Sequence, residues 1–389
     1  MVARDQDFPP CLGTRRDSCR NPALKSASIP RKKAVDLTET TVIIPSYNSS
    51  ATIEAAVQSA LAQTVPVNVI TVDDGSRDDT VQKLQALARE NSRLCVLQQP
   101  RNQGPSAARN RAIAAAETPW IAILDADDYM HPDRIRRMLQ VARAESLDIV
   151  ADDLIRVADA PSPITGTRLW SDDPIGCISI DLARFVRENI GKNTGSRREL
   201  GYLKPLMRVG FLKTHGIAYD ESMRLAEDYD LYARALSANA RFGLIDPCGY
   251  FSVDYPNSLS KAYTSTELRP IVDTDIALLR KRHLSRDERQ AISAHKALAH
   301  KQWAWVRLIE MTKKRDFRGA VRTFAAPPEV TMALVLRLCR HALGRDTIPH
   351  SGKSTPKRQA IEAMLAESNE QVGCHEAPAT VLRSNGGNI

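Results

Sequence analysis

Apolar positions along the chain alternate between short β-branched runs, typical of buried strands, and longer segments with apolar residues at helical spacing. The run at 41–45 reads Thr-Val-Ile-Ile-Pro and predicts a strand that is ended by a proline. Further runs of this kind follow it, with helical segments between them. The predicted strands are 41–45, 67–72, 94–97, 120–124 and 148–152. The predicted helices are 49–62, 79–90, 106–116 and 132–145.

This alternation with short links predicts an α/β fold, in which a mainly parallel, Rossmann-like sheet is flanked by helices on both faces. In such sheets, ligands bind beyond the carboxyl ends of the strands. Two acidic clusters stand at those ends: Asp73-Asp74 follows the strand at 67–72, and the segment 125–128 follows the strand at 120–124. The pattern therefore predicts a binding site at that edge of the sheet.

Beyond residue 255 the apolar spacing is helical, without intervening strands. A helical stretch is expected at 265–312, with Ser265 as its first cap, and another from about 327 to 344. The two ends of the chain are polar and lack apolar periodicity, apart from a short predicted helix at 357–367. The expected organisation is a disordered basic leader (1–37), an α/β catalytic domain (38–255), a helical C-terminal region (256–349) and a mostly disordered tail (350–389).

Composition narrows the class of protein without naming a function. The chain is 43% hydrophobic and 26% charged, which is ordinary for a globular protein. No apolar run reaches the roughly 18 residues that span a bilayer, and the N-terminus lacks the apolar region of a secretory signal. The seven cysteines are scattered singly, which argues against a disulfide framework and fits a reducing compartment. We therefore expect a cytoplasmic protein, either free or peripheral on the inner face of the plasma membrane.

The formal net charge of +8 admits attraction to anionic membranes, nucleic acid or phosphorylated substrates. Aromatic residues make up only 5% of the chain, and no recognised nucleic-acid-binding motif is present. We therefore expect no nucleic-acid partner.

The segment Asp125-Ala126-Asp127-Asp128 is the strongest candidate for chemistry. Two carboxylates one residue apart at a strand end can be held by a turn so that they approach one hard cation, and Mg²⁺ or Mn²⁺ suits such oxygen ligands. A cation there would neutralise the charge on a departing diphosphate. The alternative, favoured for this motif taken alone, is that the aspartates cap the next helix.

Two further motifs each admit two interpretations. Asp73-Asp74-Gly75-Ser76 either accepts hydrogen bonds from a uracil imide or ribose hydroxyls, or is a turn that caps the next helix. Glu227-Asp228 opens a segment with helical spacing at 224–236. A carboxylate held there can act as general base on an acceptor hydroxyl, or both residues only complement the helix dipole.

The order of these motifs is far more specific than any one of them. It resembles the large inverting glycosyltransferase family of GT-A fold, family 2, over roughly residues 40–255. The stretch 201–205 (Gly-Tyr-Leu-Lys-Pro), followed by His215-Gly216, is similar to bacterial exopolysaccharide enzymes of the succinoglycan ExoO type. The motifs that carry the family resemblance are, in order, Pro45-Ser46-Tyr47-Asn48, Val72-Asp73-Asp74-Gly75-Ser76, Gly104-Pro105-Ser106-Ala107-Ala108-Arg109-Asn110, Asp125-Ala126-Asp127-Asp128 and Glu227-Asp228.

The resemblance implies a nucleotide-sugar site built from the first motifs. Pro45 and Tyr47 would line the nucleobase pocket, and Asp74, or else Asp73, would read the base or the ribose. Arg109 would approach the nucleotide, although an exposed structural cation is an equally good interpretation of its position on a helix.

The resemblance also implies a further donor-binding residue, a metal ligand and the catalytic residues. Asp125 would lie near the ribose and the sugar of the donor, and Asp127 would be the principal ligand of Mg²⁺ or Mn²⁺. Asp228 would be the catalytic base, with Glu227 in support.

The implied function is transfer of a hexose, with inversion, from a UDP-sugar to a saccharide acceptor; we expect glucose and a lipid-linked exopolysaccharide repeat unit. A Q-x-x-R-W motif is absent, which argues against a processive synthase. One alternative is a nucleotide-binding or nucleotidyl-transferring enzyme, against which the lack of G-x-G-x-x-G and P-loop motifs counts. The other is a non-catalytic relative, against which the complete set of carboxylates counts.

Basic residues raise two further questions. Lys204, Arg208 and Lys213 precede the predicted base and either hold phosphates or form a solvated basic face, which is slightly favoured. The segment 330–345 predicts a helix with a narrow basic stripe and a wide apolar remainder. It either lies in an anionic membrane interface or, as slightly favoured, packs against the domain. The basic stripe consists of Arg337, Arg340, His341 and Arg345.

Overall fold

The computed structural model describes residues 38–157, 166–190, 199–253 and 264–342 of the 389-residue chain. Contacts divide the chain into two compact units, unit 1 (1–182 and 201–255) and unit 2 (183–200 and 256–389). The predicted leader, tail and tail helix lie outside the described residues. No described helix is both long enough and apolar enough to cross a membrane.

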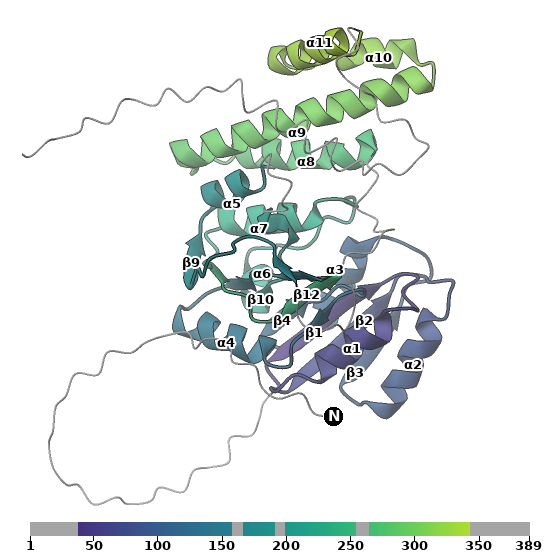
Figure 1. The fold of residues 1–389 in the computed structure, drawn as a ribbon, viewed down its shortest axis with the longest axis vertical. Helices are drawn as coiled ribbons and strands as arrows, with labels where there is room; N and C mark the ends of the chain where they lie inside the picture. The colour runs from purple at the N-terminus through teal and green to yellow at the C-terminus, as the bar shows by residue number, and fades with distance from the viewer. Residues whose placement is uncertain (1–37, 158–165, 191–198, 254–263, 343–389) are drawn as a thin grey trace, which may run out of the picture. The chain divides into compact units, whose positions relative to one another are not determined.

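The larger sheet of unit 1 contains, within the described residues, the strands β1 (Thr40–Ser46), β2 (Val67–Asp73), β3 (Leu94–Gln98), β4 (Trp120–Ile123), β6 (Ile149–Asp152), β9 (Cys177–Ile180), β10 (Leu206–Arg208) and β11 (Phe242–Ile245). Their order is β3-β2-β1-β4-β10-β6-β11-β9 (Figure 1). β3, β2, β1 and β4 are parallel, whereas β10 is antiparallel to both of its neighbours. The segments after β2 and β4 therefore emerge at the same edge, on either side of β1.

Helices flank this sheet, and their apolar faces supply its cover. α1 buries Ile53, Ala56, Val57 and Ala60, the face that its helical spacing predicts. α3 packs on β1 and β2 and begins with a proline in its first turn. The mainly parallel α/β sheet flanked by helices that the sequence predicts is thus confirmed. The described helices of unit 1 are α1 (Ile53–Leu61), α2 (Thr80–Glu90), α3 (Pro105–Ala115), α4 (Arg134–Ala144), α6 (Val209–Thr214) and α7 (Glu227–Ser237).

A second, smaller sheet was not expected from the sequence. It contains β5 (Tyr129–Met130), β12 (Tyr250–Val253), β7 (Ile155–Val157) and β8 (Thr167–Arg168), in that order. Its strands are two to four residues long, and β5 and β12 pair across more than a hundred residues of sequence, so periodicity does not reveal them. Tyr129 stacks on Phe251 with ring centroids 4.8 Å apart. This sheet fixes the segment that follows β4.

Unit 2 is helical in its described part. α8 and α9 pack along each other, and α10 and α11 pack on α9 (Figure 1). The expected single stretch at 265–312 is two helices, because Ser285 begins a new one with a capping box. The first cap is Thr264 rather than the expected Ser265, which is the first helical residue. The described helices are α5 (Leu182–Glu188, whose first residue belongs to unit 1), α8 (Ser265–Leu279), α9 (Arg286–Lys313), α10 (Phe317–Thr323) and α11 (Pro328–Ala342).

Candidate active site

The segment after β4 forms an acidic loop at residues 125–128. The backbone N–H of Asp128 donates to the carbonyl of Asp125 at 3.1 Å, which bends the loop. The buried carboxylate of Asp128 accepts hydrogen bonds from Tyr250 Oη at 2.7 Å and from the backbone N–H of Val253 at 2.9 Å. β12 thus anchors the loop through Asp128 and leaves Asp127 exposed at its tip.

These aspartates do not cap the next helix, so that alternative interpretation is wrong. The cap position of α4 is Asp133, five residues beyond Asp128. Burial and the negative charges of Asp125 and Asp127 raise the pKa of Asp128 well above its ordinary value. Asp128 therefore anchors the loop, and Asp125 and Asp127 are the carboxylates left for chemistry.

Arg109 draws the loop toward the start of α7. Its side chain on α3 is 4% exposed, so the interpretation as an exposed structural cation is wrong. Arg109 Nη2 lies 3.0 Å from Asp125 Oδ1, and Nη1 lies 2.7 Å from Glu227 Oε1. Asp228 Oδ1 is 3.9 Å from the same Nη1. One buried guanidinium thus joins three of the predicted carboxylates.

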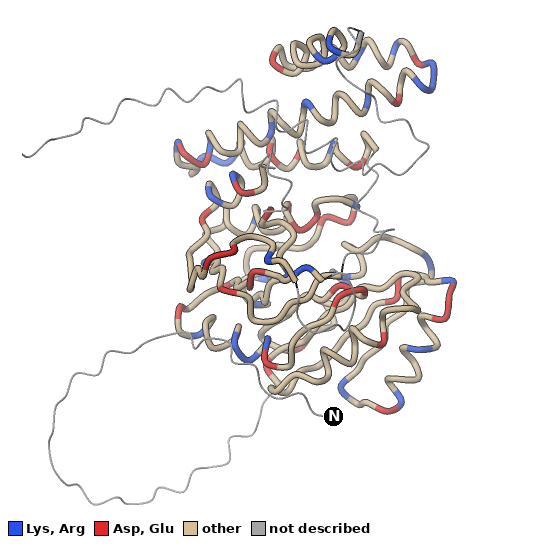
Figure 2. The backbone as a smooth tube through the Cα atoms, in the orientation of Figure 1, with Lys and Arg blue, Asp and Glu red and all other residues tan. Residues whose placement is uncertain are grey.

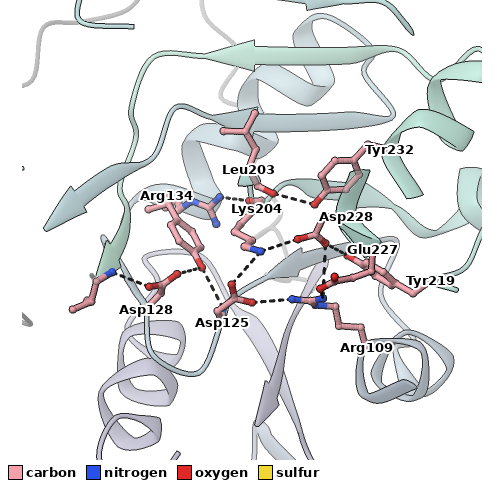
Figure 3. A network of polar contacts seen from close by, with 12 residues as sticks. Arg109, Asp125, Asp128, Arg134, Leu203, Lys204, Tyr219, Glu227, Asp228 and Tyr232 are labelled. Carbon is pink, nitrogen blue, oxygen red and sulfur yellow. Dashed lines mark hydrogen bonds and ion pairs between the residues drawn. The ribbon is translucent and has the colours of Figure 1, made fainter. Parts of the chain in front are cut away.

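Lys204 makes the second connection across the site (Figure 3). Its ammonium Nζ lies 2.8 Å from Asp228 Oδ2 and 3.0 Å from Asp125 Oδ2. Tyr219 Oη donates to the other oxygen of Asp228 at 3.1 Å. The favoured interpretation of Lys204 as part of a solvated basic face is therefore wrong. That interpretation does describe the exposed Lys213, whereas the exposed Arg208 pairs with the buried carboxylate of Asp148.

The cations set the protonation of Asp125. Burial alone would raise the pKa of this carboxyl, but Lys204 and Arg109 outweigh burial and lower it to about 2. In return, Asp125 and Asp228 raise the pKa of Lys204 above its ordinary value, although burial opposes this. At neutral pH the site therefore holds two full positive charges facing ionised Asp125.

Asp127 is in the opposite situation. Surrounding protein atoms partly desolvate its carboxyl group, although the residue as a whole is exposed, and Asp125 adds negative charge nearby. Together these effects raise the pKa of Asp127 to about 6. Among the described residues, no ion pair engages this carboxylate. A cation bound beside Asp127 would therefore stabilise the ionised form of its carboxylate.

The backbone at the start of α7 is held in an unusual conformation. Ala226 has φ +58°, in the left-handed region that residues with a Cβ seldom adopt. The turn it makes directs Glu227 and Asp228, the first residues of the helix, toward Arg109 and Lys204. Strain of this kind persists where surrounding contacts fix the chain, and it concentrates at functional sites.

Of the predicted donor-binding residues, Arg109 and Asp125 lie with Glu227 and Asp228, and the others form a separate group at the ends of β1 and β2. Both oxygens of Asp74 are occupied: Oδ1 accepts from Gln99 Nε2 at 2.6 Å and from the N–H of Gln103 at 2.7 Å, and Oδ2 accepts from the N–H of Gly104 at 2.8 Å. The carboxylate of Asp73 accepts through Oδ2 from the N–H of Ser76, and its buried Oδ1 has no partner within the described residues. Asp74 thus shapes the loop, and Asp73 keeps acceptor capacity.

Pro45 lies near the end of β1, beside Val72 of β2. Tyr47 follows it and is 40% exposed, which is unusual for a large side chain this close to a sheet. In the described part of the chain, no hydrogen bond or ion pair joins Pro45, Tyr47, Asp73 or Asp74 to Asp125, Glu227 or Asp228. The structure thus brings the catalytic candidates together with Arg109 and Asp125, and leaves Pro45, Tyr47, Asp73 and Asp74 as a neighbouring group at the same edge of the sheet.

A fully buried ion pair fixes the backbone next to the site. Arg134 on α4 and Asp152 on β6 are both 0% exposed and lie 2.7 Å apart. Asp152 also accepts from the backbone N–H groups of Cys248 and Tyr250, each at 3.2 Å. The guanidinium of Arg134 donates to the carbonyl of Lys204. This contact fixes the backbone from which Lys204 reaches the carboxylates.

Sequence reasoning missed three contributors to the site. Arg134 and Tyr250 contact site residues from distant positions in the chain, Tyr219 contacts Asp228 from nine residues away, and none lies in a recognised motif. Helical spacing does not single out Arg134, because Arg134 and Arg136 lie on the two edges of the apolar face of α4.

Comparisons with known proteins agree with this geometry. The sequence profile described as Glycosyl transferase family 2 matches residues 41–216. Succinoglycan biosynthesis protein ExoU of Rhizobium meliloti is 36% identical over 298 residues, which are 77% of this chain and 86% of that protein. Succinoglycan biosynthesis protein ExoO of the same organism is 32% identical over 337 residues, which are 85% of this chain and 94% of that protein.

A solved structure shares the fold. S. aureus TarS 1–349, in complex with UDP-GlcNAc, superposes with a TM-score of 0.55 at 20% sequence identity. The match covers 87% of this chain and 93% of that chain.

Proposed function

Since the chain belongs to glycosyl transferase family 2 and is a glycosyltransferase, we propose that it moves a hexose from a UDP-sugar to a saccharide acceptor with inversion. We expect glucose as the sugar and a lipid-linked exopolysaccharide repeat unit as the acceptor. The succinoglycan relatives support the saccharide acceptor, and the UDP-GlcNAc complex of TarS is consistent with a uridine nucleotide. An acceptor carried on lipid would place the enzyme at the inner face of the plasma membrane, as a peripheral protein.

One observation carries the proposal. Asp228 and Asp125 lie on either side of a single ammonium group, that of Lys204, within 3.0 Å of it. A candidate base and a candidate donor-side carboxylate are therefore held at a fixed separation, next to an exposed Asp127. Such fixed geometry suits a reaction in which two substrates must meet at one carbon atom.

The chemical step follows from this arrangement. The acceptor hydroxyl gives its proton to a carboxylate oxygen of Asp228, acting as general base. The hydroxyl oxygen forms a bond to the anomeric carbon while the bond from that carbon to the diphosphate breaks on the opposite face. Lys204 and Tyr219 hold the Asp228 carboxylate in place. In this scheme Lys204 touches no reacting atom, so it is a positioning residue.

The donor nucleotide would lie over the ends of β1 and β2. The exposed ring of Tyr47, with Pro45 beside it, offers an apolar surface for the base. We propose that Asp73, rather than Asp74, accepts the hydrogen bond from the base or ribose, because the oxygens of Asp74 already accept bonds from the protein.

The residues present fit a divalent cation only together with the donor. Among the described residues, no cluster of three His, Cys, Asp or Glu side chains could hold a metal ion. Magnesium is, however, commonly bound by one or two carboxylates together with substrate phosphates and water. Asp127 would be that carboxylate, and Mg²⁺ or Mn²⁺ bound there would supply positive charge to the leaving diphosphate.

The proposal can be tested with a panel of nucleotide sugars, with and without Mg²⁺ or Mn²⁺, by measuring release of the nucleoside diphosphate. Membrane lipid extract serves as the source of acceptor. Asp228→Asn should lower kcat by about 10²–10⁴-fold, the usual contribution of a general base, while nucleotide binding persists.

Asp230→Asn is the matched control, because Asp230 is a buried carboxylate on the same helix that pairs with Arg234 instead. It should retain most of the activity. Equal losses in both variants would refute the role of Asp228. A nucleotide that binds without sugar release from any donor would favour the nucleotide-binding or non-catalytic alternative.

A further inference from the structure

α11 is unusual for a surface helix, because both its buried face and its exposed face are apolar. Val330 and Leu334 are buried against α9, in a cluster with Trp305 and Leu308. On the opposite face, Met332 is 60% exposed, Val335 42% and Leu336 44%. With the exposed Cys339, these residues recur at i, i+3, i+4 and i+7 and form one continuous stripe, here called the apolar stripe.

The basic residues of α11 do not share that stripe. The guanidinium of Arg337 stacks over the ring of Trp305 on α9, 4.4 Å from its centroid. The positive charge therefore lies toward the helical bundle and along its flanks, and the apolar side chains face outward. Neither interpretation made from the sequence describes this fully, because the helix packs on α9 and still exposes a second apolar face.

The neighbouring helix adds apolar and basic groups. Phe317 and Val321 on α10 are 70% and 71% exposed. Residues 313–342 contain seven Lys or Arg and only two Asp or Glu. Figure 2 shows the Lys and Arg residues that gather where α9 passes into α10. Exposed apolar side chains are thus interspersed with an excess of positive charge.

We propose that α10 and α11 form a docking surface for an anionic lipid bilayer, with the apolar stripe entering the interface and the exposed Lys and Arg residues of 313–322 meeting the headgroups. A continuous exposed apolar stripe that is flanked by polar residues is typical of an interaction site. The combination of an apolar face with surrounding Lys and Arg is the one that binds anionic membranes.

The charge selects this occupant over a second copy of the chain. A symmetric dimer through the stripe would bring two such basic segments together, and like charges facing each other oppose association. An anionic bilayer supplies the opposite sign along the whole length of α10 and α11.

The inference deepens the proposed function, since a membrane-bound enzyme would meet a lipid-linked acceptor. It can nevertheless be tested without any substrate. The full chain is mixed with vesicles of phosphatidylcholine alone, or of phosphatidylcholine with phosphatidylglycerol, and the bound fraction is measured by flotation. We expect binding to the anionic vesicles only, and weaker binding at high salt.

Two variants separate the apolar and basic contributions. Met332→Ser, Val335→Ser and Leu336→Ser together should reduce the vesicle affinity at least about tenfold. Arg318→Ser with Arg322→Ser should reduce it about 30-fold at low salt. Arg89→Ser with Lys213→Ser is the matched control, because it removes the same charge from exposed positions of unit 1 and should change little.

Other outcomes would overturn the inference. Equal binding to neutral vesicles, or an equal loss in the control pair, would refute a specific anionic docking surface. Absence of vesicle binding by the wild-type chain would mean that another part of the chain covers the stripe. Self-association in sedimentation that the triple serine variant abolishes would identify a second copy as the occupant. None of these results bears on sugar transfer, so a failure here leaves the proposed function standing.

Discussion

Two groups of charged side chains in unit 1 both pair basic residues with carboxylates. They differ in how deeply they are buried and in what they leave available for a ligand. In the first, Arg134 pairs with Asp152, and both side chains are fully buried. In the second, Arg109 and Lys204 face Asp125, Glu227 and Asp228, whose side chains range from 9% to 27% exposed. We call the first the closed pair and the second the open cluster.

The difference lies in what remains available for a ligand. In the closed pair, Asp152 accepts from the guanidinium and from two backbone N–H groups, so its carboxylate is used up by the protein. In the open cluster, three carboxylates share two cations, and Asp127 stands beside them without an ion-pair partner among the described residues. An excess of carboxylate oxygens around fixed cations suits binding of a cation and removal of a proton.

The two groups are also connected. Arg134 donates to the carbonyl of Lys204, and the side chain of Lys204 bridges Asp125 and Asp228. The closed pair thus fixes the backbone, and the open cluster uses the side chain that the backbone presents. The comparison predicts that damage to the closed pair appears as lost stability, and damage to the open cluster as lost activity.

The largest expected effect is on stability, from Arg134→Met. Removing one partner of a buried ion pair leaves an uncompensated charge, which costs about 3–5 kcal/mol in the free energy of unfolding. Urea denaturation would measure the loss. The control is Arg143→Met, which breaks the exposed ion pair with Glu39 and should cost less than about 1 kcal/mol. Similar losses in the two variants would mean that the closed pair contributes no more to stability than an exposed ion pair does.

Part of the fold and of the site follows from the sequence alone. The parallel strands, their helices and the acidic clusters at the strand ends follow from local periodicity and spacing. Asp125 follows β4, whereas Glu227 and Asp228 open α7, and the three come together through Arg109 and Lys204.

The rest depends on contacts between distant segments. β12 and Tyr250, which anchor Asp128, lie more than a hundred residues from the acidic loop. Lys204 looked like one member of a basic face, and only the antiparallel β10, inserted between β4 and β6, brings it into the site. For Arg109 a nucleotide contact and an exposed cation were equally good interpretations, because helical spacing alone does not tell which polar residue faces a carboxylate.

A smaller, functional effect is expected for Lys204→Met. Loss of the ammonium group frees the Asp228 carboxylate to move, and displacement of about 1 Å costs on the order of 10–100-fold in kcat. KM for the donor should change less than kcat does. Measuring nucleoside diphosphate release at increasing donor concentration would separate kcat from KM. A change confined to KM would contradict a positioning role for Lys204.

The pH dependence of stability gives a second readout for Lys204. The lowered pKa of Asp125 contributes stability that is present above pH 4 and lost as the pH falls toward 2. Without Lys204 that contribution shrinks, so the wild type should exceed Lys204→Met in stability most clearly above pH 4. Lys204→Arg, which keeps the positive charge, should restore this dependence even if it only partly restores kcat.

The smallest expected effect is a gain in stability, from Asp127→Asn. The pKa of Asp127 is raised to about 6, so the protonated form is favoured by the fold, and stability is lost as the pH rises through 6. Asparagine removes that loss. Because the residue is exposed, the gain at pH 8 should be at most about 1 kcal/mol, or about 2–4 °C in Tm, and should vanish near pH 4.

Donor and metal together should make the wild type more stable than Asp127→Asn. With UDP-sugar and Mn²⁺ present, the wild type gains stability by binding, whereas Asp127→Asn should gain little, since it lacks the proposed ligand. Thermal unfolding of both proteins across pH, with and without donor and metal, measures the two effects together. If the asparagine variant is less stable in every condition, Asp127 stabilises the loop, as Asp128 does. The open cluster would then leave fewer carboxylate oxygens available for a ligand than we infer.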